Sequence, residues 1–290
     1  ASGNFTLVYH LSQAGFPFAD SALQFPANSG GAPGSGTGIV GKGCAFNGSS
    51  DFLDAGRIDL GKTFTLSAWV NIAPTVMNEQ TIWCNKSGGW NTAGFDLYVN
   101  SYRTNDGIIY FDSADGVGGS VPARTAFQTV SFGLWHLLTG VMDGVNGSVH
   151  VYVDGSDKTI NTAVDAAFQS TNYVRCGALL TGAPGSSGGL PFDGSMDEAR
   201  IENGVRSPGW VWASWATVAD AAFADYGAVL PAAVRLQIRL VDGQIVVTWP
   251  EGALQTASSP AGPFSDLESA TSPYTNAPSN GSEFFRVRVQ

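Results

Sequence analysis

The stretch "TFTLSAWVNI", residues 63–72, alternates apolar side chains with other residues over ten positions. Successive side chains of a β-strand point to opposite faces, so residues two apart share a face. The pattern therefore predicts a strand with one face in a hydrophobic core. The residues predicted to face that core are Phe64, Leu66, Ala68, Val70 and Ile72.

The same alternation recurs on both sides of this stretch, between turns rich in Gly, Ser, Asn and Pro. Because the predicted strands are separated by turns and not by helices, we expect an all-β fold, an antiparallel jelly-roll sandwich. The other predicted strands are 5–11, 38–48, 80–86, 94–100, 107–113, 134–143, 147–155, 172–178 and 196–202.

One helix is predicted after these strands. Ser207 is a favourable N-cap residue, and Pro208 suits the first helical turn. The helix is expected to run to Tyr226, before Gly227. Trp212 and Trp215 recur at helical spacing, so we expect them to pack the helix against the sandwich.

A second, smaller β domain is predicted at the C-terminal end. "LQIRLVDGQIVVTWP", residues 236–250, has the pattern of a hairpin with an Asp-Gly turn. We therefore predict a jelly-roll domain over residues 1–228, a linker over 229–235 and a small β-sandwich over 236–290.

Charge and composition narrow the class of partner. The 290 residues include 14 Lys and Arg against 24 Asp and Glu, a net charge of −10. Such a chain repels phosphate backbones, which disfavours nucleic acid as a partner. Apolar runs stay shorter than the roughly 18 residues that span a bilayer, so we predict no membrane insertion. We expect the three cysteines to be small buried residues: Cys44, Cys84 and Cys176. The alternative, for an exported protein, is a disulfide between one pair of them.

Several segments together resemble a known family. "VYHLSQAGFPFADS", "GKGCAFNGSSDFLDAG", "FTLSAWVNI", "WHLLTGVMD" and "FDGSMDEARIENGVRS" are similar in sequence and order to the laminin G-like, concanavalin A-like domains of secreted bacterial proteins. The C-terminal segment resembles small immunoglobulin- or fibronectin-like modules. The resemblance implies a concanavalin A-like jelly roll, an extracellular (secreted or cell-surface) location, and an N-terminus processed from a longer precursor.

The resemblance also implies a calcium ion at the rim of the sandwich. The matching ligand positions are Asp20 in "FADS" and Asp197 in "SMDEAR". Calcium takes six to eight oxygen ligands. The alternative is that Asp20 caps a turn and that Asp197 pairs with Arg200 or with backbone amides.

Catalytic carboxylates are not predicted. In "MDEARIEN" Glu198, Arg200 and Glu202 are expected on one face, opposite Asp197. Four residues of strand separate Glu198 from Glu202 by roughly 13 Å, whereas a retaining glycosidase needs its carboxyls about 5 Å apart. A glycoside hydrolase or lyase on this fold is therefore disfavoured. The histidines, His10, His136 and His150, are expected to be structural.

Aromatic residues suggest carbohydrate binding. If the strands that carry them are neighbours, Trp69, Trp83, Tyr98 and Tyr110 form a row on one sheet, to which nearby loops add Trp90 and Tyr102. Apolar sugar faces stack on such rings. The alternative is that loops or the Trp-rich helix cover the row. We predict a secreted, non-enzymatic recognition or adhesion module for a glycan or extracellular polysaccharide. The alternative function is a structural subunit that self-associates through β-domain contacts.

Overall fold

The structure is a computed structural model in which "TFTLSAWVNI" forms strand β6 (Thr63–Ile72). It describes residues 4–13, 15–29, 31–74, 78–86, 88, 91–165, 167–168, 171–178, 189–223, 235–278 and 281–289. The five apolar residues predicted to face the core belong to the main hydrophobic cluster. β6 lies between β11 (Trp135–Asp143) and β15 (Asp193–Asn203), antiparallel to both.

The chain divides into two compact units, unit 1 (Ala1–Ala224) and unit 2 (Asp225–Gln290). Of the predicted linker, 229–235, only Arg235 is among the described residues. The two units are therefore described separately.

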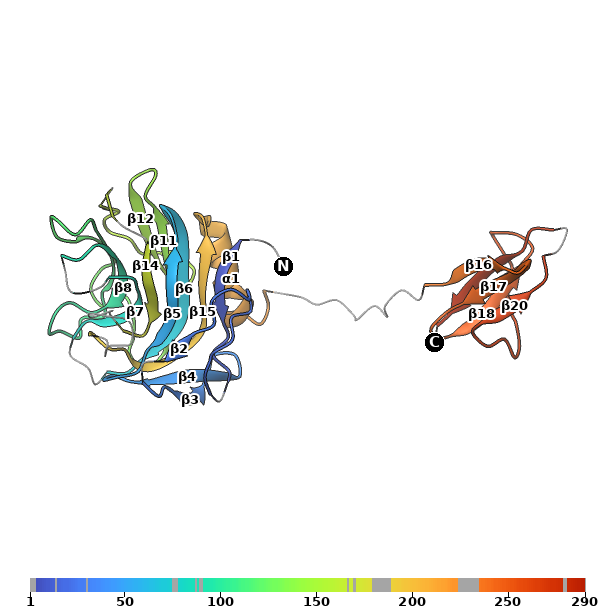
Figure 1. Ribbon diagram of the computed structural model, residues 1–290, viewed down its shortest axis with the longest axis horizontal. Helices are drawn as coiled ribbons and strands as arrows, with labels where there is room; N and C mark the ends of the chain where they lie inside the picture. The colour runs from blue at the N-terminus through green and yellow to red at the C-terminus, as the bar shows by residue number, and fades with distance from the viewer. Residues whose placement is uncertain are drawn as a thin grey trace. The chain divides into compact units, whose positions relative to one another are not determined.

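Unit 1 contains an eight-stranded antiparallel sheet in the order β13-β12-β11-β6-β15-β4-β3, with β1 also paired to β15 (Figure 1). We call it the first sheet. Its remaining strands are β1 (Phe5–Tyr9), β3 (Gly34–Thr37), β4 (Lys42–Asn47), β12 (Ser148–Val153) and β13 (Ser156–Asp157).

The second sheet of unit 1 has seven strands in the order β10-β9-β8-β7-β14-β5-β2. Its strands are β2 (Asn28–Ser29), β5 (Leu53–Asp59), β7 (Gln80–Cys84), β8 (Gly94–Val99), β9 (Ile109–Ala114), β10 (Val121–Arg124) and β14 (Thr171–Cys176). The sequence pattern missed β5, because its apolar alternation stops at Gly56, which has φ +79°. The strand layers confirm the all-β, concanavalin A-like sandwich.

The core of unit 1 lies between the two sheets. Phe64 on β6 contacts Phe95 on β8, with ring centroids 4.9 Å apart. Gly140 on β11 makes room for the opposite layer, because a Cβ at this position would lie 2.4 Å from Phe111 Cδ2. All three cysteines are buried thiols, and burial raises the pKa of Cys44 to about 12. The cysteines therefore act as small core residues, as predicted.

Helix α1 (Pro208–Ala219) covers part of the outer face of the first sheet. The Ser207 side chain accepts a hydrogen bond from the Trp210 N–H at 3.3 Å, which confirms the predicted N-cap. The helix ends earlier than predicted, because Asp220 is extended and its carboxylate accepts the Ala222 N–H. Val211 provides the buried apolar contact with the sheet. Trp212 is 48% exposed, but a Cβ at Gly155, in the turn between β12 and β13, would lie 3.5 Å from Trp212 Cδ1 and 3.2 Å from Trp215 Cβ. Both tryptophans therefore lie against the sandwich, as predicted, although much of Trp212 stays exposed.

A β-bulge in β15 changes which acidic residues share a face. The register shifts between Asp197 and Arg200, and Glu198 has φ +48°. Asp197 pairs with Trp69, and Glu202 pairs with Thr65, both on the outer side of β6. The prediction that Asp197 lies on the face opposite Arg200 and Glu202 is therefore wrong. One extra residue in the strand reverses the side-chain alternation after it.

Unit 2 consists of two three-stranded antiparallel sheets, β16-β17-β20 and β19-β18-β21. Trp249, Val247 and Leu254 form its buried cluster. The strands are β16 (Gln237–Val241), β17 (Gln244–Thr248), β18 (Ala253–Ala257), β19 (Ser265–Asp266), β20 (Tyr274–Asn276) and β21 (Phe284–Arg288).

Candidate functional site

The six predicted sugar-binding aromatics do not form one row. Trp69 lies on β6, which belongs to the first sheet, whereas the strands that carry Trp83, Tyr98 and Tyr110 belong to the second. Trp69 is on the outer face of its sheet, as expected, but only 4% exposed. Trp90 lies outside the described residues.

Trp83 lies in the core and not on the outer face. It is completely buried, and its indole N–H donates to the Ser67 carbonyl on the opposite sheet at 3.1 Å. The reason is a register shift between Thr81 and Trp83 in the β7–β8 pair. The shift turns Trp83 inward, so the prediction that it lies on a ligand-binding face is wrong.

Tyr98 and Tyr110 are neighbours on the outer face of the second sheet, as predicted. They face each other across the β8–β9 pair, and their rings stack with centroids 5.0 Å apart and an interplanar angle of 8°. Tyr98 is 4% exposed, and Tyr110 is half-buried. The pair therefore forms a fixed aromatic platform that solvent reaches through Tyr110.

The loop after β8 extends this platform to solvent. Ser101 Oγ donates to Asp106 Oδ2 at 2.5 Å, and it accepts from the Tyr110 hydroxyl at 2.8 Å. Tyr102 is 61% exposed, and the Arg103 guanidinium lies 4.9 Å from its ring centroid. We call Ser101, Tyr102, Arg103, Asp106 and Tyr110 the tyrosine edge.

A second loop runs beside the tyrosine edge. The Gln128 N–H donates to the Asp106 carbonyl at 2.8 Å, and the Thr129 N–H donates to the Gly107 carbonyl at 3.1 Å. This loop carries Phe127, which is 64% exposed. Sequence reasoning missed Phe127, because it lies between predicted strands and only the fold brings its loop to residues 106–107.

Beside the aromatic pair, on the same face of the second sheet, lies a group of buried charged residues that the sequence analysis did not identify. Asp96 on β8 and Asp112 on β9 face each other across the strand pair. The Lys86 ammonium lies 3.6 Å from Asp112 Oδ2, and the Tyr98 hydroxyl donates to the same oxygen at 3.4 Å. Lys86, Asp96 and Asp112 are 2%, 4% and 3% exposed. We call these three residues the buried charge cluster.

The sequence contains a signal for the pairing of Asp96 with Asp112. "FDLYV" places Asp96 two residues before Tyr98, and "IYFDS" places Tyr110 two residues before Asp112. In an antiparallel hairpin this mirrored order sets Tyr opposite Tyr and Asp opposite Asp. A search for carboxylates within one strand cannot find such a pair.

Burial favours the neutral form of these carboxyls. It raises the pKa of Asp96 well above its ordinary value, and the nearby Asp112 adds to this against the opposing effect of Lys86. Burial also raises the pKa of Asp112, although Lys86 again opposes the shift. Glu79, half-buried, has its pKa raised by burial and by Asp112. Removal from water destabilises a carboxylate more than a carboxylic acid.

Asp20 organises a turn. Its Oδ1 accepts the Val8 and Ala22 N–H groups at 2.8 and 2.9 Å, and its Oδ2 accepts those of Gln24 and Phe25 at 3.0 and 2.9 Å. A carboxylate offers about four acceptor positions. All four are used by backbone donors, which matches the turn-capping alternative.

Asp197 is likewise engaged by the backbone. Its Oδ2 accepts from Val40 N, and its Oδ1 accepts from Glu198 N, each at 2.9 Å. Gly38 closes the space beside it, since a Cβ there would lie 2.4 Å from Asp197 Oδ2. These contacts of Asp20 and Asp197 match the alternatives of a turn cap and of pairing with backbone amides. Across the described ranges there is no group of three or more His, Cys, Asp or Glu that could hold a metal, and calcium binding stays a prediction.

The remaining acidic residues of β15 and the histidines are paired. Glu198 Oε2 accepts from the Arg200 guanidinium at 2.5 Å, and Glu198 Oε1 lies 2.7 Å from His10 Nδ1. Glu202 pairs with Arg206. His136 and His150 contact aspartates at 2.7 and 2.8 Å. These contacts show that the side chains have partners; the structural role of the histidines stays a prediction.

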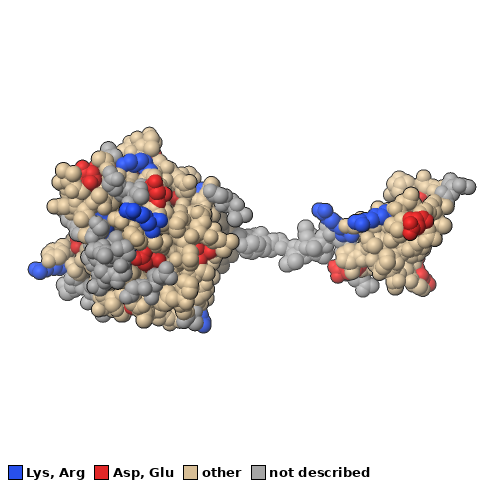
Figure 2. All heavy atoms as spheres, in the orientation of Figure 1, with Lys and Arg blue, Asp and Glu red and all other residues tan. Residues whose placement is uncertain are grey.

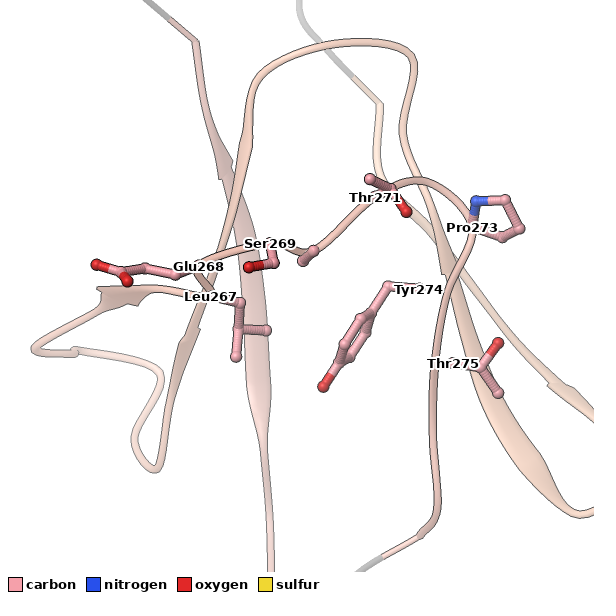
Figure 3. A pocket seen from close by; sticks show the side chains of 8 residues that line it. Leu267, Glu268, Ser269, Thr271, Pro273, Tyr274 and Thr275 are labelled. Atoms are coloured by element: carbon pink, nitrogen blue, oxygen red, sulfur yellow. The ribbon is translucent and has the colours of Figure 1, made fainter.

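Unit 2 contains an open pocket of about 400 Å³ (Figure 3). Tyr274 and Leu267 supply apolar surface, and the hydroxyls of Ser269 and Thr271 supply polar groups. Figure 3 shows the Glu268 carboxylate pointing away from Tyr274. No second carboxylate or base lines the pocket, so it has the character of a surface hollow.

Charge on the visible face of unit 1 is sparse and mixed in sign, without a single-sign patch (Figure 2). This suits an uncharged ligand better than a polyanion. No helix in the described part of the chain is long and apolar enough to cross a membrane.

Comparison with known proteins gives a family and a fold. The model of the concanavalin A-like lectin/glucanases superfamily matches residues 47–211, more than half of the chain. Domain 4 of AbnA, an extracellular arabinanase from Geobacillus stearothermophilus solved with arabinotriose, has a TM-score of 0.57 and 21% identity, covering 72% of this chain and 97% of that one. A Trypanosoma rangeli sialidase has a TM-score of 0.51 and 17% identity, covering 73% of this chain but 32% of its own. Among curated proteins, no sequence matches the chain. At these identities the two structures show a shared fold.

Proposed function

The chain belongs to the concanavalin A-like lectin/glucanases superfamily, and on that premise we propose that it is a secreted, non-enzymatic module that binds carbohydrate at the tyrosine edge. The observation that carries the proposal is an exposed aromatic ring, Tyr102, on a loop fixed by hydrogen bonds to the stacked Tyr98–Tyr110 pair. Sugar recognition needs an apolar surface with a few fixed polar groups beside it.

The loop that carries Tyr102 is held in place at both ends. Asp106 Oδ1 accepts the Ser101 and Ile108 N–H groups at 3.2 and 3.1 Å. Asn100 Oδ1 accepts the Gly107 N–H at 3.1 Å. A loop ordered before binding loses less conformational freedom when a ligand arrives. The tyrosine edge therefore suits recognition of an oligosaccharide without rearrangement.

Polar groups at the edge match the hydroxyls of a sugar. Arg103 provides donors directly beside the Tyr102 ring. The Tyr110 hydroxyl, which donates to Ser101, keeps an acceptor position for a ligand hydroxyl. The arabinotriose in the structure of the arabinanase domain is consistent with an oligosaccharide as ligand. We place the module outside the cell, which fractionation of the source cells with a specific antibody tests.

A non-catalytic role is proposed because the paired carboxylates are out of reach of a ligand. Asp96 and Asp112 are 4% and 3% exposed. A glycosidase needs its acid and nucleophile on either side of the bond that is cleaved. Carboxyls that are almost completely buried beside a stacked aromatic pair do not meet that requirement.

The test is a glycan array followed by calorimetric titration of the best ligand. We expect Tyr102→Ala to weaken binding about tenfold, the loss of roughly 1.4 kcal/mol of stacking. Tyr110→Phe removes only the hydroxyl that holds Ser101, so we expect a smaller loss. Trp212→Ala is the matched control, an aromatic of similar exposure on the other sheet's outer helix. Equal affinity of the parent and Tyr102→Ala would remove the tyrosine edge from the ligand site.

Self-association through unit 2 is a second candidate, supported by one observation. β16 is the edge strand of its sheet, and all five of its residues are exposed. Ile238 and Leu240 are 53% and 71% exposed. An exposed apolar edge strand can pair with another chain. Sedimentation of the parent and of Leu240→Lys tests this: assemblies that dissociate in the variant support it, and a monomeric parent excludes it.

A further inference from the structure

The buried charge cluster is unusual for a purely structural ion pair. Lys86 Nζ and Asp112 Oδ2 are 3.6 Å apart, whereas a charge-assisted hydrogen bond between such groups measures about 2.7–2.9 Å. Oδ1 of Asp112 and Oδ1 of Asp96 accept no hydrogen bond of ordinary geometry within the described residues, although the Thr81 and Ser120 hydroxyls act to lower the pKa of Asp96 and Asp112 respectively. Two buried charges with unsatisfied oxygens are costly to keep. A stabilising salt bridge therefore does not explain why these three residues are buried together.

The path of the Lys86 side chain across β8 brings its ammonium to Asp112. Lys86 follows β7, and its stem crosses β8 at Gly94, where a Cβ would lie 3.1 Å from Lys86 Cγ. The ammonium thereby reaches Asp112 on β9 and Ser120 Oγ, directly before β10. Asn85 Oδ1 accepts the Phe95 N–H at 2.7 Å, which fixes the chain before the lysine. The amine and the carboxyl are thus held together before any reaction.

From this geometry we propose that Lys86 and Asp112 join in an intramolecular amide bond that the folded protein forms by itself, with Asp96 as the neighbouring acid. Asp96 is placed for this role, because it is directly opposite Asp112 on the same face, where the Cβ atoms of such a pair lie about 4.5–5.5 Å apart.

The reaction is a condensation that needs no co-reactant. Transfer of a proton from the Lys86 ammonium to the Asp112 carboxylate gives the amine and the carboxylic acid that react. Burial favours the protonated form of such a carboxyl, in agreement with the raised pKa of Asp112 and Asp96. The Lys86 Nζ lone pair attacks Cγ of Asp112, and the C–N bond forms. The Asp96 carboxyl passes a proton from the nitrogen to the departing hydroxyl, the C–O bond breaks, and one water leaves.

Two physical effects favour the product. Reacting groups fixed in contact have effective molarities of about 10⁵–10⁸ M, which offsets the usual disadvantage of condensation in water. The amide also replaces two buried charges by one neutral group and removes an oxygen that would need a donor. The bond would tie the end of β7 to β9 across β8, two residues along β9 from Tyr110 of the tyrosine edge.

Intact mass of the full, reduced and denatured protein tests the proposal. We expect the parent to be lighter than its sequence mass by one water. Trypsin should not cut at the modified Lys86, so residues 63–103 should appear joined to residues 104–124. A parent with the full sequence mass after prolonged incubation in the folded state would overturn the proposal.

Two other outcomes also count against it. A succinimide at an Asp-Gly sequence would remove one water but leave cleavage after Lys86 intact. A link from Lys86 to Asp96 would remove water within residues 63–103 and leave 104–124 separate. Either result overturns the assignment to Asp112.

Variants give a chemical signature that packing alone does not produce. Asp112→Asn keeps the shape, and its condensation releases ammonia, so its mass should fall by one ammonia and not by one water. Lys86→Met keeps the stem without the amine and should retain its full sequence mass. Asp96→Asn should slow or abolish the loss of water while circular dichroism shows an unchanged fold. Loss of water from Lys86→Met would refute the assignment of the lysine.

Discussion

Replacing Trp83 by Phe separates a core role from a ligand-binding role. Trp83 is completely buried, and its indole N–H donates to the Ser67 carbonyl at 3.1 Å, from one sheet to the other. Phe keeps an aromatic ring but has no donor and fewer ring atoms. We therefore expect Trp83→Phe to destabilise unit 1 without weakening glycan binding.

The magnitude follows from two terms. Loss of one buried hydrogen bond costs about 1 kcal/mol. Loss of the additional indole atoms, without full closure of the space, costs about 2 kcal/mol. The free energy of unfolding of unit 1 should therefore fall by about 3 kcal/mol. With a urea m-value of roughly 2–3 kcal/mol/M, the midpoint should fall by about 1–1.5 M.

The assay is urea unfolding followed by far-UV circular dichroism, because tryptophan fluorescence changes with the substitution itself. Trp212→Phe, on a side chain that is 48% exposed, is the control and should shift the midpoint little. An unchanged midpoint for Trp83→Phe, or a loss of glycan affinity at unchanged stability, would refute the reasoning and return Trp83 to the ligand site.

Three further predictions follow from particular contacts. Gly140→Ala should destabilise unit 1 by about 1–3 kcal/mol, measured by thermal unfolding, because its Cβ would lie 2.4 Å from Phe111 Cδ2; a neutral change would contradict the packing described here. Asp20→Asn should cost about 1–3 kcal/mol at neutral pH. Burial opposes ionisation of Asp20, but its four backbone hydrogen bonds together hold its pKa below 3.8; their contribution is present above that pH and is lost as the pH falls through the folded pKa. The stability difference between parent and Asp20→Asn should therefore shrink on acidification below about pH 4, and a constant difference would exclude this account. Because backbone donors occupy Asp20 and Asp197, EDTA should leave the Tm of the parent unchanged, and a fall in Tm reversed by added calcium would restore the metal hypothesis.

Local patterns predicted the elements of unit 1 well. β6, β8, β9, β11 and β12 lie where alternation of apolar residues placed them. The start of α1 followed from Ser207 and Pro208, because capping depends on residues adjacent in the chain. Its end did not, since Asp220 turns the backbone away before the apolar pattern ceases.

The candidate site was predicted only in part. Tyr98, Tyr110 and Tyr102 belong to it, and the mirrored sequence around Tyr98 and Tyr110 held enough information to pair them. Trp69 and Trp83 do not, because one lies on the other sheet and the other faces the core. Phe127 and the buried charge cluster depend on segments that are distant in the chain.

The sequence by itself determined the class of fold, most of the longer strands and the start of the helix, because two-residue and helical periodicity are properties of neighbouring residues. Only the tertiary structure decided which face each residue takes after the bulges at Thr81–Trp83 and Asp197–Arg200, since one extra residue reverses all later side chains. It also decided which strands are neighbours, and so brought Lys86 to Asp112 across β8. The order of strands in a sheet depends on packing of the whole core, so it cannot be predicted from any short stretch of sequence.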